Sequence, residues 1–284
     1  YHLTMEAYFE AKSKLFTEVL RPDGMAVINN DSIYAKSLML LVQSRGTRVL
    51  TYGVDSPADL RAINITLHNA SIQFDLVTKN QTWPQIRVPV VSHFQVENIL
   101  CAIGMVMAEN VPLTEIVPVL PHLTSAVGRM QLAGTTGDGA AIYVDYAHTP
   151  DALIRALQAL KQHLPETGKL HVVFGCGGNR DTGKRHIMGG VADQLADVIY
   201  VTDDNPRFED PNYIRAQVLS GCPKGQEVAD RYIAIKKAID GLAPDDILLV
   251  AGKGHETGQT ILNEVIPFCD VQVVQEILKG ICTS

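Results

Sequence analysis

Apolar positions in the first 120 or so residues change their spacing several times, which predicts a mixed region of helices and strands. Between residues 5 and 20 they recur at nearly helical intervals, with Thr4 available as an N-cap and a turn at residues 21–24. Short apolar runs typical of strands follow, and then two longer helical stretches. The predicted strands are 25–29, 48–52, 62–68, 72–78 and 86–90, and the predicted helices are 96–109 and 113–120.

From about Leu123 the pattern becomes regular: an apolar strand, a turn rich in glycine or polar residues, then an amphipathic helix. This alternation predicts a parallel, doubly wound sheet. We place a domain junction near residues 121–128, giving domains 1–124 and 125–284. The predicted strands are 142–144, 170–174, 198–202 and 247–250, and the predicted helices are 153–164, 187–195, 213–219 and 233–242.

The helix after Thr149 has the strongest local signals. Thr149 is a good N-cap, and Pro150 suits the first helical position because it lacks the N–H that would be unpaired there. An apolar stripe along the following residues then faces a core. Its members are Leu153, Ala156, Leu157, Leu160 and Leu164.

Composition narrows the class of protein. The 284 residues are 46% hydrophobic and carry a net charge of −7, so the chain can fill substantial cores and lacks the broad basic surface that nucleic acid or anionic lipid requires. Five irregularly spaced cysteines favour a reducing compartment over disulfides or zinc. No apolar run is long enough to span a membrane, and the first residues do not resemble a signal peptide. We therefore expect a cytoplasmic protein without nucleic-acid or membrane partners. Because the chain begins with Tyr1 rather than with Met, we also expect it to be a fragment.

Four polar, glycine-bearing loops follow the predicted strands of the second domain. They span residues 145–151, 175–181, 203–207 and 252–256. In a doubly wound sheet, ligands bind beyond the carboxyl ends of the strands, so these loops should meet at one edge. Acids, arginines and histidines at every strand end predict a site for charged substrates, because a purely structural sheet does not need them.

The loop Asp204-Asn205-Pro206-Arg207 suits a zwitterionic amino acid. An arginine pairs bidentately with a carboxylate, an asparagine offers a donor and an acceptor, an aspartate can hold an ammonium, and a proline stiffens the turn. The same residues could instead form an ordinary capped turn with an exposed arginine, and local sequence does not choose between these readings. Glu256 is a second acid that could bind an amine, and Gly252 would let the backbone approach a ligand.

Other single signals are weak. Residues 178–185 come close to a phosphate-binding G-x-x-x-x-G-K-[ST] loop but have Arg185 where the magnesium-binding hydroxyl should stand. Taken alone, His148 is more often a satisfied polar histidine than a catalyst, and Lys12 is by default a solvated surface charge.

Together, in order, these motifs resemble those of the Mur ligases, and within that family the members that add diaminopimelate. The resemblance covers essentially the whole chain and is far more specific than any one motif. It rests on residues 4–8 with 11–12, 128–130, 145–151, 174–181, 183–185, 202–207 and 251–256.

The resemblance implies an activity and a site. ATP would phosphorylate the D-glutamyl carboxylate of UDP-N-acetylmuramoyl-L-alanyl-D-glutamate, and an amine of meso-diaminopimelate would attack the acyl phosphate, with Mg²⁺ neutralising charge. Lys12 resembles the family's carbamylated lysine, whose anionic side chain helps to place magnesium. The residues that it assigns to ATP are Asn98, Arg129 (phosphate), Asp145 (ribose), His148, Asp151 and Lys184. Those that it assigns to diaminopimelate are Arg180, Asp204, Asn205, Pro206, Arg207, Gly252 and Glu256.

The chain also departs from the family pattern. It has no complete phosphate loop, no upstream acid and metal-binding histidine before Tyr1-His2, and no amino-terminal sugar-binding domain, while Gln95 and Asn98 stand where the family has two asparagines. Residues 1–124 would be the carboxyl-terminal part of the central ATP-binding domain, and residues 125–284 a Rossmann-like amino-acid-binding domain. We expect a monomeric, truncated ligase with negligible activity alone. A non-catalytic diaminopimelate-binding module and an L-lysine-adding relative are the alternatives.

Overall fold

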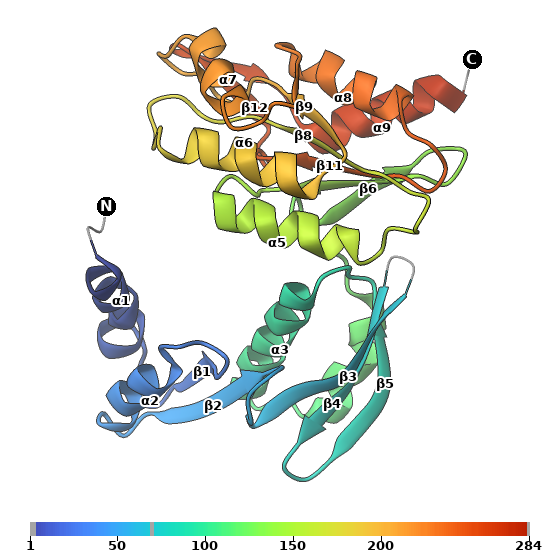
Figure 1. Cartoon of the computed structure of the whole chain (residues 1–284). Helices are drawn as coiled ribbons and strands as arrows, with labels where there is room; N and C mark the ends of the chain where they lie inside the picture. Colours follow the sequence, from blue (N-terminus) through green and yellow to red (C-terminus); the bar gives the residue numbers. More distant parts are fainter. Residues whose placement is uncertain (1–3, 69–70, 283–284) are drawn as a thin grey trace. The chain divides into compact units, whose positions relative to one another are not determined.

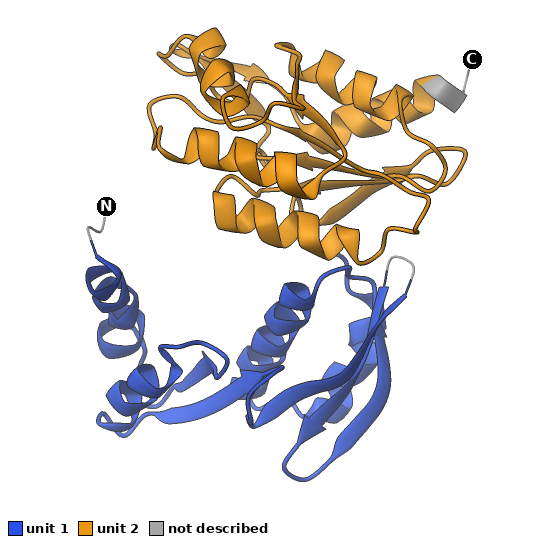
Figure 2. Ribbon diagram, viewed as in Figure 1, with its two compact units in different colours: residues 1–124 blue, residues 125–284 orange. Residues whose placement is uncertain are grey.

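The chain folds into two compact units, Tyr1–Thr124 and Ser125–Ser284, which are coloured separately in Figure 2. The computed structural model describes residues 4–68 and 71–282. No helix in this described part is long and apolar enough to cross a membrane. Each unit has its own sheet and its own buried core.

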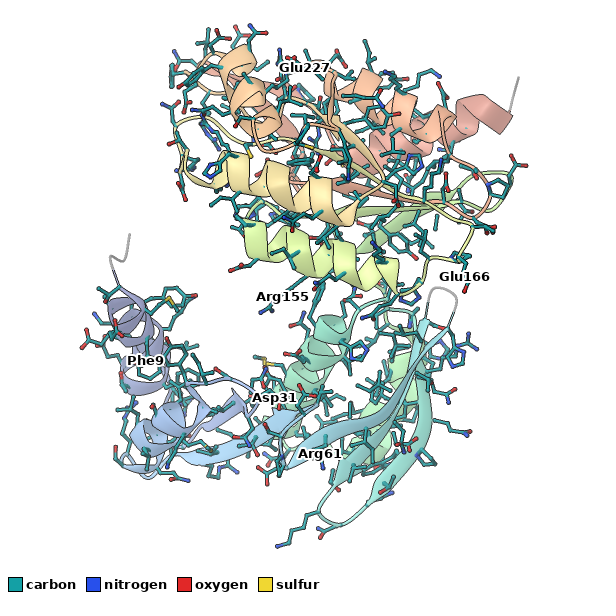
Figure 3. The ribbon with its side chains drawn as sticks, viewed as in Figure 1. Phe9, Asp31, Arg61, Arg155, Glu166 and Glu227 are labelled. Atoms are coloured by element: carbon teal, nitrogen blue, oxygen red, sulfur yellow. The ribbon has the colours of Figure 1, made fainter. Side chains whose placement is uncertain are left out.

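The first unit begins with the predicted helix, which changes geometry part-way. Helix α1 spans Met5–Lys14 and continues as a π-helix, η1, over Leu15–Val19. Thr4 caps it as predicted, its Oγ1 accepting a hydrogen bond from the Ala7 N–H at 3.2 Å. Phe9, labelled in Figure 3, stacks on Tyr34 with ring centroids 4.9 Å apart.

The sheet of the first unit has the order β1-β2-β3-β4-β5 (Figure 1). Its strands are β1 (Met25–Asn29), β2 (Arg48–Gly53), β3 (Leu60–His68), β4 (Ser71–Thr78) and β5 (Thr82–Val88). The first three run parallel to one another, and the remaining pairings are antiparallel. The sequence predicted these strands; only the last was misplaced, because β5 starts four residues earlier than the apolar run at 86–90 suggests.

Helices pack against this sheet. They are α2 (Ala35–Gln43), α3 (His93–Ala108), α4 (Leu113–Ile116) and the 3-10 helix η2 (Val117–His122). The sequence analysis missed α2. Helix α3 lies so close to β1 that a Cβ on Gly104 would come within 2.7 Å of the Val27 Cγ1 atom.

The second unit has the predicted parallel sheet, with strand order β10-β9-β8-β11-β7-β6. Its strands are β6 (Gln131–Thr135), β7 (Ala141–Asp145), β8 (Leu170–Phe174), β9 (Val198–Val201), β10 (Gln226–Glu227) and β11 (Ile247–Ala251). Only β6 runs antiparallel to its neighbour. A separate hairpin joins β12 (Gly258–Ile261) to β13 (Glu264–Pro267).

Helices cover both faces of this sheet, which confirms the doubly wound architecture (Figure 1). They are α5 (Pro150–Lys161), α6 (Lys184–Leu195), α7 (Pro211–Leu219), α8 (Arg231–Asp240) and α9 (Asp270–Cys282). Helices α8 and α9 share one apolar core with β7 and β11, in which Val144, Leu248, Ala238 and Val274 are buried. Helices α5, α6 and α7 pack side by side against the other face.

The predicted start of α5 is confirmed. The Thr149 Oγ1 accepts a hydrogen bond from the Ala152 N–H at 3.3 Å, and Pro150 occupies the first turn. Four residues of its predicted stripe are buried: Leu153, Ala156, Leu157 and Leu160.

The sequence analysis missed β6, β10, the β12–β13 hairpin and α9. The strands are short, and the residues of β10 and β13 are exposed, so no apolar run marks them. They form because neighbouring chain segments offer backbone partners, which local sequence does not reveal.

Candidate amino-acid and nucleotide site

The four polar loops lie at one edge of the second sheet. They follow β7, β8, β9 and β11, which pair in parallel, so their carboxyl ends point the same way. The backbone joins two of these loops directly, since the Gly252 N–H donates to the Asp145 carbonyl at 3.1 Å. The convergence that the sequence predicted is therefore present.

The loop Asp204–Arg207 is held on two sides by the backbone. The Gly178 N–H donates to the Asn205 carbonyl at 2.8 Å, and a Cβ on Gly178 would lie only 1.9 Å from the Pro206 carbonyl oxygen. On the other side, Arg207 bridges to β12: its N–H donates to the Thr260 carbonyl at 3.0 Å. Arg207 has a φ of 53°, a left-handed conformation that non-glycine residues adopt only when their surroundings impose it.

The Arg207 side chain is half-buried, and part of its hydrogen-bonding capacity is used by backbone carbonyls. Its Nη1 donates to the Gly178 carbonyl at 2.9 Å and to the Asn205 carbonyl at 3.4 Å. No acceptor among the described residues bonds its Nε or Nη2, so one planar edge of the guanidinium remains for a ligand. The alternative interpretation of this loop, an ordinary capped turn with an exposed arginine, does not fit this environment.

Asp204 and Gly252 meet where β9 and β11 end. Asp204 is buried, and Gly252 has a φ of 113°, which favours glycine. A Cβ on Gly252 would come within 2.8 Å of the Asp204 Oδ2. In the part of the chain that the structure describes, no donor bonds the Asp204 carboxylate, so this buried anion is available to an ammonium group.

Glu256 and Asn205 are directly bonded. The Asn205 Nδ2 donates to the Glu256 Oε2 at 2.8 Å, and the Lys253 Nζ donates to the same oxygen at 3.1 Å. Burial tends to raise the pKa of the Glu256 carboxyl, but these bonds and the charges of Lys253 and Arg207 outweigh it and hold that pKa below its usual range. Glu256 is thus kept ionised. Lys253 belongs to the predicted polar loop 252–256, but the sequence analysis gave it no role.

Arg180 lies on the loop after β8 and is exposed. Gly177 separates it from Arg207: a Cβ on Gly177 would stand 2.8 Å from the Arg207 Nη1 and 3.9 Å from the Arg180 Cγ. Both arginine side chains therefore lie next to Gly177.

Two buried arginines to which the sequence analysis assigned no supporting role hold these loops in place. Arg231 is completely buried and pairs through two bonds of 2.8 Å with Asp270, while its Nη2 donates to the Ala251 carbonyl at 2.9 Å. Arg185 bonds Glu209 and donates to the Gly177 carbonyl at 3.1 Å. Both side chains therefore hold backbone carbonyls at or just after the ends of strands that carry the loops.

The residues expected around ATP in this unit form a second group. The Arg129 guanidinium carbon lies 4.7 Å from the centroid of the Tyr146 ring, and the His148 ring lies 4.4 Å from the same ring. The Lys184 Nζ donates to the His148 carbonyl at 2.6 Å. The His255 ring, 5.0 Å from Tyr146, connects this group to the loop of Glu256.

Asp145 is buried at the end of β7 and accepts a hydrogen bond from the Met130 N–H at 2.7 Å. Burial raises the pKa of its carboxyl, although backbone N–H groups and Arg129 act in the opposite direction. Asp151 is exposed in the first turn of α5, where a negative charge also suits the helix dipole.

The structure describes Lys12 and Asn98 within the first unit. Lys12 is exposed on α1, with its Nζ 5.5 Å from the centroid of the Tyr8 ring. Asn98 is exposed on α3. Gln95 is buried and belongs to the capping box of α3, where its Oε1 accepts from the Ser92 N–H at 3.1 Å, so its side chain is already committed.

Residues 178–185, which nearly match a phosphate loop in sequence, do not form an anion-binding loop of that kind. The Gly178 N–H bonds Asn205, the Asn179 N–H bonds Glu209, and the Gly183 N–H donates to the Asp181 Oδ1 at 2.9 Å. A phosphate loop needs such N–H groups free to face the anion.

Two Mur ligase family profiles match the chain. The family profile of the Mur ligase middle domain matches residues 1–106, and that of the Mur ligase glutamate ligase domain matches residues 128–254. The chain belongs to the Mur ligase family. A UDP-N-acetylmuramoyl-L-alanyl-D-glutamate–2,6-diaminopimelate ligase of Chelativorans sp. (strain BNC1) is 42% identical over 279 residues, which are 98% of this chain and 57% of that protein.

Solved structures of Mur ligases share the fold. One, of a UDP-N-acetylmuramoyl-L-alanyl-D-glutamate–2,6-diaminopimelate ligase, is 36% identical with a TM-score of 0.66, and the match covers 100% of this chain and 58% of that one. The MurF ligase of Thermotoga maritima in complex with ADP is 16% identical with a TM-score of 0.69, covering 98% and 58%. This Mur ligase chain thus spans a little over half the length of the relatives that it matches.

Proposed function

We propose that this chain provides the amino-acid-binding part of an ATP-dependent ligase that joins meso-diaminopimelate to UDP-N-acetylmuramoyl-L-alanyl-D-glutamate. The observation that carries the proposal is the charge pattern at the ends of β9 and β11. Arg207 keeps a free guanidinium edge and lies close enough to Glu256 to lower the pKa of that carboxyl, and Asp204 precedes it in the same loop. Such a pocket suits an amino-acid end that bears both a carboxylate and an ammonium group.

The amino acid follows from what each substrate offers. Diaminopimelate has an amino-acid group at each end, so one end can bind here while the other amine reacts. L-Lysine lacks the distal carboxylate and would leave Arg207 without a partner. Relatives about 40% identical are named as diaminopimelate ligases, which supports the same choice.

The proposed reaction has two steps. The γ-phosphoryl group of ATP passes to the D-glutamyl carboxylate, ADP leaves, and an acyl phosphate forms. The deprotonated amine of diaminopimelate then attacks the acyl carbon, so that a C–N bond forms, the C–O bond to phosphate breaks, and phosphate departs. Phosphorylation is needed because a carboxylate by itself is a poor electrophile.

For ATP we propose the second group of residues. Arg129 would contact phosphate, Asp145 would accept from a ribose hydroxyl, and His148, Asp151 and Lys184 would lie nearby, with Asn98 at the adenine. The buried Asp145 carboxylate suits a hydroxyl donor, since a hydrogen bond would offset part of its desolvation. The ADP complex of the structurally similar MurF ligase supports an adenine nucleotide as co-substrate.

Magnesium is a separate part of the proposal. The described residues include no cluster of three or more His, Cys, Asp or Glu side chains that could hold a metal ion. Lys12 would contribute only after carbamylation, which replaces a cation with an anion. The residues present therefore do not make a complete metal site, and nucleotide phosphates would have to supply further ligands. We extend the proposal to a monomer working in the cytoplasm, where ATP and the UDP-linked precursor occur.

Calorimetric titration of the 284-residue chain with meso-diaminopimelate and with L-lysine tests the amino-acid assignment. We expect clear binding of diaminopimelate and much weaker binding of lysine. Equal affinities would contradict the assignment. ADP release by a longer protein that contains this chain, dependent on the UDP-linked dipeptide, tests the ligase activity; diaminopimelate binding without any such turnover would favour the non-catalytic module.

A further inference from the structure

Lys253 is a completely buried cation with every donor in use. Its Nζ donates to the Gly258 carbonyl at 2.7 Å, to the Glu256 Oε2 at 3.1 Å and to the Asn205 Oδ1 at 3.2 Å. An ammonium group has three N–H donors, so none remains for a ligand. Any effect of Lys253 on binding must therefore act through Asn205 and Glu256.

The Asn205 amide has one allowed orientation. Its Oδ1 accepts from Lys253 and from the Thr260 N–H at 2.8 Å, which uses both lone pairs of a carbonyl oxygen. If the amide were flipped, its NH₂ would face these two donors and lose both bonds. One hydrogen of Nδ2 goes to Glu256, and the other is left. Asn205 can thus offer a ligand a donor but not an acceptor, which is narrower than its residue type suggests.

Glu256, in contrast to Asn205, can offer a ligand only a hydrogen-bond acceptor. Its Oε2 accepts from both Asn205 and Lys253, while no donor among the described residues bonds Oε1. The Lys253 cation compensates this carboxylate, which would otherwise be costly to keep ionised in a half-buried position. An anionic acceptor therefore stands beside an N–H donor.

We propose that Lys253 is a positioning residue that sets the polarity of the amino-acid pocket. It locks Asn205 as a donor for the ligand carboxylate and keeps Glu256 available as the acceptor for the ligand ammonium. The bound end of diaminopimelate would then direct its carboxylate toward Asn205 and Arg207 and its ammonium toward Glu256. This inference rests on the proposed function.

The test compares Lys253→Met with Lys236→Met in the full chain. Lys236 also pairs with a carboxylate, the Asp240 Oδ2 at 2.7 Å, but on the exposed surface of α8. By calorimetry, Lys253→Met should raise the Kd for meso-diaminopimelate roughly 30-fold or more, while Lys236→Met should change it less than about twofold. Binding of L-lysine should change less than that of diaminopimelate, because lysine has no distal carboxylate for Asn205.

The pH dependence separates positioning from a merely structural role. Binding needs ionised Glu256 and weakens as the pH falls through the pKa of that carboxyl. In the unmodified chain this pKa is low, with Asn205, Lys253 and Arg207 facing the carboxylate and Arg231 within its electrostatic reach. Without Lys253 the pKa should rise, so the acidic limb of the binding curve should move to higher pH.

Lys253→Gln provides a milder version if Lys253→Met fails to fold, as judged by circular dichroism. It keeps hydrogen-bond donors while removing the positive charge, and the same shift of the acidic limb is expected. A folded variant with the affinity and pH profile of the unmodified chain would overturn the role of Lys253 and leave the proposed function intact. Absence of diaminopimelate binding by the unmodified chain would instead count against the proposed function.

Discussion

The candidate residues of the two units differ in how far the protein holds them in place. In the second unit, Asn205, Glu256 and Lys253 form a closed set of hydrogen bonds, and Arg231 behind them is fully buried. In the first unit, Lys12 and Asn98 are exposed side chains on helices. Asn205, Glu256, Lys12 and Asn98 were all assigned from the same family resemblance.

The difference indicates two kinds of site. A pocket that is prearranged before the ligand arrives loses little entropy on binding and can select between similar amino acids. An exposed lysine gains a defined role only through a modification, a metal or a nucleotide. The amino-acid pocket should therefore work within this chain, whereas the roles of Lys12 and Asn98 should become measurable only in catalysis.

The largest expected effect comes from breaking the buried pair behind the pocket. Asp270→Leu leaves the Arg231 charge buried without a partner and should cost about 3–5 kcal/mol of unfolding free energy. Asp240→Leu removes the exposed partner of Lys236 and should cost no more than about 1 kcal/mol. Urea denaturation followed by circular dichroism measures both. Equal effects would show that burial of the pair does not matter.

The next effect concerns the ligand. Arg207→Ala should weaken binding of meso-diaminopimelate by about 2–5 kcal/mol, because the ligand carboxylate loses a bidentate partner. Arg155, an exposed arginine on α5 that is labelled in Figure 3, is the control, and Arg155→Ala should leave the affinity unchanged. Titration calorimetry gives both values. If L-lysine loses as much affinity as diaminopimelate does, Arg207 does not read the distal carboxylate.

Replacing Asp145 by Asn should raise the stability of the chain and weaken its binding of nucleotide. Because its pKa is raised in the folded chain, its contribution to stability is complete below the ordinary value of 3.8 and is lost as the pH rises through the folded value. Asp145→Asn cannot ionise, so its stability relative to the unmodified chain should increase as the pH rises above the ordinary value of 3.8. Nucleotide binding should weaken in the same variant. Urea denaturation at several pH values checks the sign, and a difference that does not vary with pH would contradict it.

The smallest effect is expected for Lys12. Since Lys12 is exposed and its Nζ lies 5.5 Å from the centroid of the Tyr8 ring, Lys12→Ala should change the unfolding free energy by less than about 0.5 kcal/mol. In a longer protein with ligase activity, the same substitution should abolish turnover, and short carboxylates should restore part of it. An unchanged turnover would indicate that Lys12 is an ordinary solvated surface charge.

Much of the fold could be predicted because local chemistry and burial agree. Thr149 and Pro150 begin α5, and two runs become buried strands: Leu170–Phe174, apolar except for His171, forms β8, and the wholly apolar Ile247–Ala251 forms β11. Elements without such a pattern were missed. Strand β12 is only half-buried, yet its Thr260 N–H holds Asn205 and its backbone holds Arg207. Nothing in the local sequence of residues 258–261 indicates that role, because it depends on a loop more than 50 residues away.

The sequence by itself determined the alternation of strands and helices, the polar loops at the strand ends and the residues that name the family. These are properties of neighbouring residues and of their order along the chain. Only the tertiary structure decided which atoms of those residues remain for a ligand. Asn205 becomes a pure donor, and Glu256 keeps one free oxygen, because Lys253 and Thr260 reach them from other segments. Hydrogen-bond capacity is shared between partners that meet only in the folded chain, so residue type alone cannot allot it.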